Sequence, residues 1–357
     1  VAEGNSGAQQ LTYGQPEISS ITPEPAVGRQ ITIKGKNFSP ESVVVVSGLL
    51  VPGIQIQDTE TIVLTVPQIS GGMTVTVRSR GGLQGILTSD LTLRAIETPH
   101  RVTGNVLVSS GVTLRFEPGV VLQVEPNRVV VVSGTLLARG TTATPIRFTS
   151  SAPTTQPGDW GYIIFTDTSV DASYDTSGNY VSGSVLEHVV VEYAGASISG
   201  SDYAVRLVDA APLIQRATIR QNRGAGISVA LNPTRLSSPR ILNSTITANG
   251  AGIVATYPRN TLIVDGNTIS SNTGIGVLLN SQYGPEFGGS VNSTPSVATM
   301  SNNVIRSNGD DGLWAQTTGS SELSVTDNTI ANNRRGVGIS GGAVFSRNHV
   351  EGNSPAG

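Results

Sequence analysis

The sequence predicts an all-β protein in two parts, a sandwich of short strands followed by a solenoid of stacked coils. Three observations support this prediction. The chain of 357 residues contains 42 glycines and only 13% charged residues, its apolar residues occur in short runs bounded by turn formers, and a motif recurs in its second half at intervals of 20 to 36 residues. Long amphipathic helices would need far more Lys, Glu, Ala and Leu, so we expect no long helix.

The composition excludes several kinds of function. The chain has no cysteine, which excludes disulfides, thiolate metal sites and thiol catalysis. Its formal net charge of −3 does not favour binding to nucleic-acid phosphates, and no apolar run is long enough to predict a membrane span. With Ser, Thr, Asn and Gly throughout, these features suit a secreted or surface-displayed bacterial protein. No signal peptide is visible, as expected if Val1 is a mature N-terminus left after cleavage.

Residues 1–15 are expected to form a flexible N-terminal arm, and residues 16–95 a β-sandwich. Five runs in the second segment alternate in polarity or are rich in β-branched residues, and each is bounded by Gly, Pro, Asn or Asp. The runs are PEISSITP, QITIKGKNF, SVVVVSG, TIVLTVP and MTVTVRS. Short strands at this spacing are typical of a β-sandwich.

The order of these signals resembles the IPT/TIG family of immunoglobulin-like domains. The segments that carry the resemblance are Pro16-Glu-Ile18, Ser20-Ile21-Thr-Pro23, Gly28, Ile31-Thr-Ile33-Lys-Gly35-Lys-Asn37-Phe38, Thr65-Val66-Pro67 and Gly71-Gly72. The resemblance implies an Ig-like sandwich that serves as a spacer or binding module of surface proteins. We expect no DNA binding by this domain, because residues 1–100 contain only six Lys and Arg.

After a short linker at residues 96–100, one motif repeats through the second part of the chain, residues 101–357. Each copy has a central isoleucine, an asparagine three residues later, and a glycine six or seven residues after the isoleucine. The isoleucines are Ile219, Ile246, Ile269, Ile305 and Ile330. The asparagines are Asn222, Asn249, Asn272, Asn308 and Asn333, and Asn353 belongs to one further copy.

Repeats of this length cannot each bury an apolar face, so they must stack, one coil per repeat at about 4.8 Å. In such a stack the asparagines would form a ladder, each bonded through its side-chain amide to the copies above and below. The isoleucines would form one inward row, and the aliphatic residues that follow the glycines a second. We expect the glycines, which are Gly226, Gly252, Gly276, Gly312 and Gly336, to serve a tight bend.

With these repeats, residues 101–357 resemble the right-handed parallel β-helix family, which has the pectate-lyase-like fold and PbH1-type repeats and occurs in many surface proteins. The segments GNVLVSSGVTLRFEPGVVLQV and GTLLARGTTATPIRFTSS are similar to opening coils of this fold. The resemblance, and not the spacing, implies the handedness. We therefore expect a single-stranded right-handed parallel β-helix of roughly 9 to 11 coils, with loop insertions near residues 166–180 and 280–296.

Two adjacent carboxylates, Asp310 and Asp311, are the candidates for an acid/base pair. Hydrolases similar to polygalacturonases use such carboxylates, but their Gly-His-Gly and Arg-Ile-Lys motifs are absent from this sequence. A lyase needs a base, and residues 101–357 contain no lysine, which leaves Arg223, Arg334 and Arg335. Because Arg334 and Arg335 should lie beside the two carboxylates in the next coil, we favour a structural role for all four.

Two further features have both a structural and a functional interpretation. Asp167, Asp171 and Asp175 recur every four residues, which is compatible with calcium binding or with a solvated loop. Trp314 follows an inward leucine and should face outward, where it could contact a glycan together with Tyr283. The alternative is that the loop at 280–296 covers the indole, and we favour this packing.

The three histidines are far apart in the sequence and fall on different coils. His188 and His349 align with asparagines that precede the inward isoleucines, so we expect them to belong to a ladder and not to a catalytic site. His100 precedes the repeats. The sequence therefore predicts no set of acid, base and anchor that converges at one place.

The last residues, VEGNSPAG, stop partway through a repeat. Either the chain is part of a longer protein, or the open end docks on another subunit, since an uncovered coil exposes apolar rows and strand edges. We therefore expect a non-enzymatic extracellular structural or adhesive protein, a self-associating subunit of a fibre, sheath or surface layer that needs no cofactor. The alternatives are a glycan-binding surface module and a polysaccharide lyase or hydrolase.

Overall fold

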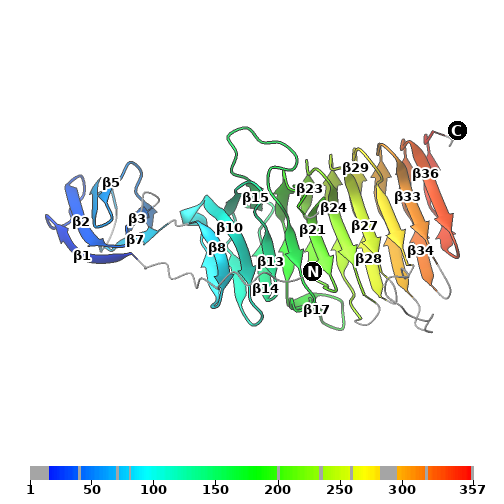
Figure 1. Ribbon diagram of the computed structural model, residues 1–357, viewed down its shortest axis with the longest axis horizontal. Coiled ribbons are helices and arrows are strands. Elements are labelled where there is room, and N and C mark those ends of the chain that lie inside the picture. The colour runs from blue at the N-terminus through cyan, green and yellow to red at the C-terminus, as the bar shows by residue number, and fades with distance from the viewer. Residues whose placement is uncertain are drawn as a thin grey trace.

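The computed structural model describes residues 16–38, 42–69, 72–79, 82–198, 202–232, 236–257, 260–281, 296–317 and 321–354. The regular secondary structure of these residues consists of strands and one short 3-10 turn, η1 (Ala95–Glu97). A small domain lies at one end of a long solenoid whose coils stack along the long axis (Figure 1). In the described ranges no helix has the length and apolar character needed to cross a membrane.

The small domain is a sandwich of two antiparallel sheets, with strand orders β1-β2-β6-β5 and β4-β3-β7. Its strands are β1 (Glu17–Thr22), β2 (Gln30–Lys36), β3 (Ser42–Val46), β4 (Leu49–Leu50), β5 (Gln55–Asp58), β6 (Thr61–Thr65) and β7 (Val75–Ser79). Alternate residues of β2 point inward, so Ile31 and Ile33 are fully buried in one core with Val44 and Ile62. The Ig-like sandwich predicted from the sequence is therefore present.

Each coil of the solenoid contributes to three parallel sheets, which we call sheets 1, 2 and 3. Sheet 1 has ten strands: β9 (Leu91–Leu93), β11 (Thr113–Phe116), β14 (Thr135–Arg139), β19 (Val185–Glu187), β22 (Leu213–Gln215), β25 (Arg240–Leu242), β28 (Thr261–Asp265), β31 (Val297–Ser301), β34 (Glu322–Thr326) and β37 (Val344–Ser346). One strand per coil gives ten coils, within the expected range.

Sheets 2 and 3 share β10 (His100–Val108), whose two halves pair with different strands. The other strands of sheet 2 are β12 (Val121–Val124), β15 (Ile146–Ser150), β20 (Val189–Glu192), β23 (Thr218–Arg220), β26 (Thr245–Thr247), β29 (Thr268–Ser270), β32 (Val304–Arg306), β35 (Thr329–Ala331) and β38 (His349–Glu351). Those of sheet 3 are β8 (Leu83–Leu87), β13 (Val130–Val132), β16 (Ile163–Phe165), β21 (Tyr203–Val208), β24 (Ala225–Ala230), β27 (Ala251–Thr256), β30 (Val277–Asn280), β33 (Asp311–Gln316) and β36 (Arg335–Ser340).

Strand pairing extends the solenoid to residues that precede the boundary at residue 95 predicted from the sequence. β8 pairs in parallel with β10, and β9 pairs in parallel with β11. Residues 83–93 thus belong to the first coil, and the expected linker at 96–100 lies within the solenoid. The strands of the sandwich and of the first coil share the same short, β-branched pattern, so hydrophobic alternation does not separate them.

The core of the solenoid consists of inward rows that run from coil to coil. In sheet 2 the parallel register aligns the repeat isoleucines, and all five are fully buried. In sheet 3 the second predicted row is also in register, and its members from Ile227 to Leu313 are fully buried. Burial of one such side chain contributes about 1.5–3 kcal/mol, and the stack repeats that contribution in every coil.

The predicted asparagine ladder lies at the bend between sheets 2 and 3. Each amide nitrogen donates to the Oδ1 atom of the next asparagine at 2.8 to 3.1 Å, from Asn222 through to Asn353. Its second hydrogen goes to a backbone carbonyl of the preceding coil, as from Asn272 to Ile246. The residue before each of the first five asparagines has a φ of 55 to 56°, so these five bends have the same geometry.

A second ladder lies at the bend between sheets 1 and 2, at the position for which the sequence predicted a ladder that includes His188 and His349. The amides of Asn267, Asn303 and Asn328 donate to the next member at 2.9 to 3.0 Å, and the last acceptor is Asn348. The expectation that His188 and His349 occupy this position is wrong. His188 lies at the bend itself, with a φ of 48°, and His349 is an exposed residue next to Asn348.

The repeated glycines do not serve a bend, which corrects the second expectation about the motif. None of the five has a positive φ. A Cβ atom on Gly252 would lie 2.2 Å from the carbonyl oxygen of Gly276 and 2.6 Å from Cγ2 of Ile269. The glycines are required because their α-carbons face the isoleucine and asparagine rows of the neighbouring coil, where no side chain fits.

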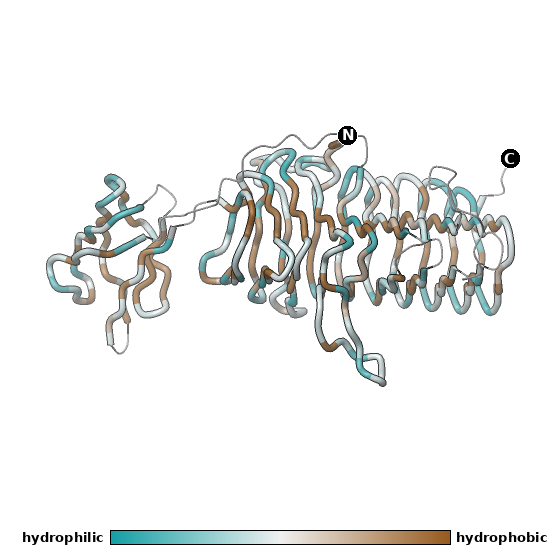
Figure 2. Tube along the Cα trace, turned by 60° about the horizontal axis from the view of Figure 1, so that its bottom comes forward, coloured by the Kyte–Doolittle hydropathy of each residue, from teal (hydrophilic) through white to brown (hydrophobic). Residues whose placement is uncertain are grey.

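One inserted loop covers part of sheet 1. It contains a hairpin of β17 (Ser173–Tyr174) and β18 (Tyr180–Ser182) and protrudes below the coils in Figure 2. The ring of Tyr174 stacks on the guanidinium of Arg240, which lies on the outer face of sheet 1, at 3.6 Å. The other predicted insertion lies outside the described residues between positions 282 and 295.

Candidate functional site

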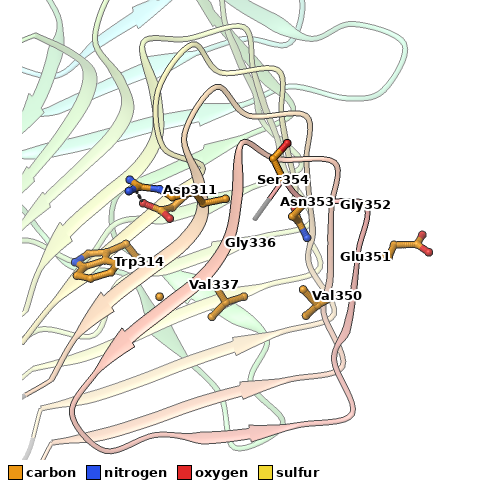
Figure 3. Close-up of a pocket in the computed structure, with 11 residues that line it drawn as sticks. Asp311, Trp314, Gly336, Val337, Val350, Glu351, Gly352, Asn353 and Ser354 are labelled. Carbon is orange, nitrogen blue, oxygen red and sulfur yellow. Dashed lines mark hydrogen bonds and ion pairs between the residues drawn. The ribbon is translucent and has the colours of Figure 1, made fainter. Parts of the chain in front are cut away.

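The two candidate carboxylates, Asp310 and Asp311, lie at the start of β33. Arg334 and Arg335 lie beside them in the next coil. The Arg334 guanidinium donates to Asp310 Oδ1 at 2.6 Å. Arg335 donates to Asp310 Oδ1 and to Asp311 Oδ2, both at 2.7 Å. Figure 3 shows Asp311 joined to a guanidinium beside the cleft at the end of the solenoid. The coil register therefore brings together all four residues that the sequence singled out.

The electrostatics of this cluster oppose acid catalysis. A general acid must hold its proton near neutral pH and so needs a raised pKa. The hydrogen bond from Arg334, with the nearby charge of Arg335, instead holds the pKa of Asp310 below its usual value. Asp311 is only 6% exposed and is bonded to Arg335. Both carboxylates thus act as charged partners of the arginines.

The low pKa of Asp310 gives a testable pH dependence. The ionised carboxylate contributes stability above its unfolded pKa, near 4, and the contribution is lost as pH falls through the lower folded pKa. We expect Asp310→Asn to lower the free energy of unfolding by at most about 1 kcal/mol at pH 7, since the pair is partly exposed. Urea unfolding at pH 7 and pH 3 should show this difference shrinking in acid; a difference that grew in acid would contradict the ion pair.

Trp314 lies next to this cluster on the outer face of sheet 3. Its indole covers Gly338 of the next coil, where a Cβ atom would lie 2.2 Å from Cε3. The side chain remains 40% exposed and borders a cleft of about 470 Å³ that also contains Asp311 and Arg335. Tyr283, its expected companion, lies outside the described residues, as does most of the loop expected to cover the indole.

A second cleft on sheet 3, of about 490 Å³, was not predicted from the sequence. The Arg206 guanidinium stacks on the ring of Tyr203 at 4.7 Å, and Arg223 forms an ion pair with Asp202 at 3.3 Å. The strand register places Arg206 and Trp314 in one outward row, four coils apart. This distance is about 19 Å. The repeat alignment predicted that Trp314 faces outward, but Arg206 precedes the first copy of the motif and had no place in that alignment.

The three aspartates proposed for calcium do not converge. Asp171 Oδ1 accepts a hydrogen bond from the backbone N–H of Ala211, and Asp175 accepts bonds from Ser177 and Asn179 within its own turn. Asp167 lies near the start of the same loop. Across the part of the chain that the structure describes, no group of three metal-ligating side chains lies close enough to hold an ion. Asp175 therefore stabilises a turn within the loop, and Asp171 connects the loop to the chain at Ala211.

The final described coil has an apolar face that is open. Its inward side chains, Val337, Ile339, Phe345 and Val350, line a cleft of about 400 Å³. Phe345 and Val350 are 42% and 45% exposed, although their counterparts one coil earlier, Val325 and Ile330, are fully buried.

Comparisons with known proteins agree with the two-part architecture. The profile described as "Right handed beta helix region" matches residues 173–354, "Pectate-lyase like beta helix domain" matches residues 85–204, and "IPT/TIG domain" matches residues 16–95. The second match begins within β8, which is also the first strand that pairs within the solenoid. A comparison with curated proteins found no match.

A comparison with solved structures found several similar chains at low identity. The A-module of the mannuronan C-5 epimerase of Azotobacter vinelandii is 15% identical over 71% of this chain and 70% of that one, with a TM-score of 0.34. The Dettilon tailspike protein is 14% identical over 75% and 54%, with a TM-score of 0.31. The family 28 exopolygalacturonase of Yersinia enterocolitica is 10% identical over 96% and 87%, with a TM-score of 0.21. These similarities concern the fold alone.

Proposed function

This chain belongs to the right-handed β-helix family and carries an IPT/TIG domain ahead of its coils, and from this premise we propose that it is a non-enzymatic extracellular structural or adhesive subunit that self-associates end to end. A fibre, a sheath or a surface layer would each use such a rod. The observation that carries the proposal is the stack itself, because ten described coils held in register by two asparagine ladders and continuous inward rows form a rod.

The state of the candidate catalytic residues also supports a structural role. Asp310 and Asp311 are bonded to Arg334 and Arg335. A base must be free to take a proton and an acid must have one to give. The hydrogen bond from Arg334 holds the pKa of Asp310 below its usual value, and Arg335 bonds to both carboxylates, so Asp310 is not suited to act as a general acid.

Incubation with a panel of neutral and acidic polysaccharides tests the absence of catalysis. We expect no new reducing ends and no unsaturated ends above the level of a heat-denatured control. If such ends do appear and Asp310→Asn or Arg334→Ala abolishes them, the protein is an enzyme and the structural proposal is wrong. The exposed Arg306→Gln, on the outer face of sheet 2, is the matched control.

A second candidate function, glycan binding, is favoured by the outward row of sheet 3. An exposed indole at Trp314 can stack on a sugar ring, and the guanidinium of Arg206 can bind a carboxylate. We expect an oligosaccharide that binds here to change the tryptophan fluorescence, because Trp160 is fully buried and Trp314 is exposed. Loss of that change in Trp314→Ala, with the fold intact by circular dichroism, would support binding, and an unchanged response would exclude this row.

A further inference from the structure

The outward row of sheet 3 has different chemistry at its two ends. Strand register aligns five residues of successive coils, which are Arg206, Ser228, Val254, Leu278 and Trp314. Val254 is the middle member, with two coils on each side of it, which is about 10 Å in each direction. A guanidinium and an indole therefore lie on opposite sides of Val254 at the same distance from it.

The guanidinium end of the row is a cleft. Its volume is about 490 Å³, and Arg206, stacked on the ring of Tyr203 at 4.7 Å, lines it together with small side chains of β24 and β27. Asp202, the only carboxylate among the described residues that line this cleft, pairs with Arg223 instead. Arg206 thus has an aromatic contact but no ion-pair partner among the described residues, and such a cation favours a further aromatic ring.

The indole end of the row is a projection. Trp314 is 40% exposed, and Figure 3 shows its ring on the side of the coils away from the inward Val350. The ion-pair cluster beside it combines two carboxylates with two guanidinium groups, so this end opposes an approaching cation with no net charge. Tryptophan and arginine are the side chains that most often dominate the binding energy of an interface.

We propose that the row binds a second copy of the chain, side by side and antiparallel, so that the cleft of each copy receives Trp314 of the partner subunit. A two-fold axis that passes through the coil of Val254, along the strands, places Arg206 against that indole, and it does so twice. The contact is self-complementary and closes at two copies. It goes beyond the proposed end-to-end association, because it joins the sides of two rods and not their ends.

Light scattering of the full chain over a concentration series measures the pairing. We expect Arg206→Ala and Trp314→Ala each to raise the dissociation constant at least about tenfold, because each variant removes both copies of the contact. An equimolar mixture of the two should associate more tightly than either alone, since Arg206 of one chain can then meet Trp314 of the other. A mixture without this recovery would overturn the inference.

The matched control for the mixing experiment is Arg306→Gln. Arg306 is an exposed arginine on the outer face of sheet 2, so its replacement should leave the dissociation constant unchanged. An equal loss in this variant would mean that general charge, and not the row of sheet 3, drives association. That result would also overturn the inference. Circular dichroism verifies that all three variants are folded.

Single-cysteine variants test the geometry, because the chain has no cysteine of its own. The axis brings Thr256, an exposed residue of the same strand as Val254, close to its own copy, whereas Thr245 is exposed on sheet 2 of the same coil. A short bis-maleimide should join two copies of Thr256→Cys and leave Thr245→Cys monomeric. Assembly in which neither variant becomes cross-linked would overturn the lateral contact and leave the proposed end-to-end association standing.

A glycan is the competing occupant of this row. A chain that stays monomeric at every concentration would overturn both the lateral contact and the proposed self-association. If an oligosaccharide then changes the fluorescence of that monomer, and Trp314→Ala abolishes the change, the row binds a glycan in place of a second copy.

Discussion

Replacement of Asn272 by alanine is expected to lower the free energy of unfolding by about 3 kcal/mol. The Asn272 Oδ1 atom accepts the backbone N–H of Asn249 and its amide Nδ2 at 3.0 and 3.1 Å. Both donors are buried, and each buried donor left without a partner costs about 1–3 kcal/mol. Urea unfolding followed by circular dichroism measures the loss.

Thr245→Ala is the control for the ladder prediction. Thr245 is an exposed residue on an adjoining coil of the same solenoid, and its truncation should change stability by less than about 0.5 kcal/mol. If Asn272→Ala had an equally small effect, the ladder would be a consequence of stacking and not one of its causes.

Gly252→Ala is expected to destabilise the solenoid by about 3 kcal/mol. The new Cβ atom would lie 2.2 Å from the carbonyl oxygen of Gly276 and would also touch Ile269. Overpacking of this kind costs about 1–3 kcal/mol or more, and here the obstructing atom belongs to a backbone that neighbouring strands hold in place. The midpoint of urea unfolding is the measurement.

The matched variant for this prediction is Gly342→Ala. A Cβ atom at Gly342 would meet nothing within 4 Å, and its φ is not in the left-handed region. We expect a neutral or slightly stabilising effect, since alanine restricts the unfolded chain more than glycine does. Equal losses in the two variants would mean that flexibility, and not space between coils, explains the repeated glycines.

The stacking was predictable from the sequence because the repeat fixes which residues lie one coil apart. The alignment of Asn308 with Asn333 also placed Asp310 beside Arg334 and Arg335, and both arginines donate hydrogen bonds to Asp310. The ends of the repeat array were harder to locate. Residues 83–93 form the first coil without any copy of the motif, and their alternation is shared with the sandwich.

Other features depend on geometry that the motif does not encode. The role of Gly252 depends on how closely its α-carbon approaches the neighbouring coil. The spacing of the glycines along the chain cannot distinguish that role from a role in a bend. Asn348 and His349 are adjacent in the sequence. An alignment of the repeats that is shifted by one residue therefore assigns His349 to the second ladder in place of Asn348. The stacking of Arg206 on Tyr203 depends on two outward residues of one strand, which belong to no repeat.

We propose that the protein is a structural subunit that self-associates end to end. Negative-stain electron microscopy of the full chain across a concentration series tests this claim most directly. We predict rods at low concentration and, at higher concentration, longer particles in which rods are joined end to end. Single rods at every concentration would contradict the claim, and would direct attention to the glycan-binding row of sheet 3.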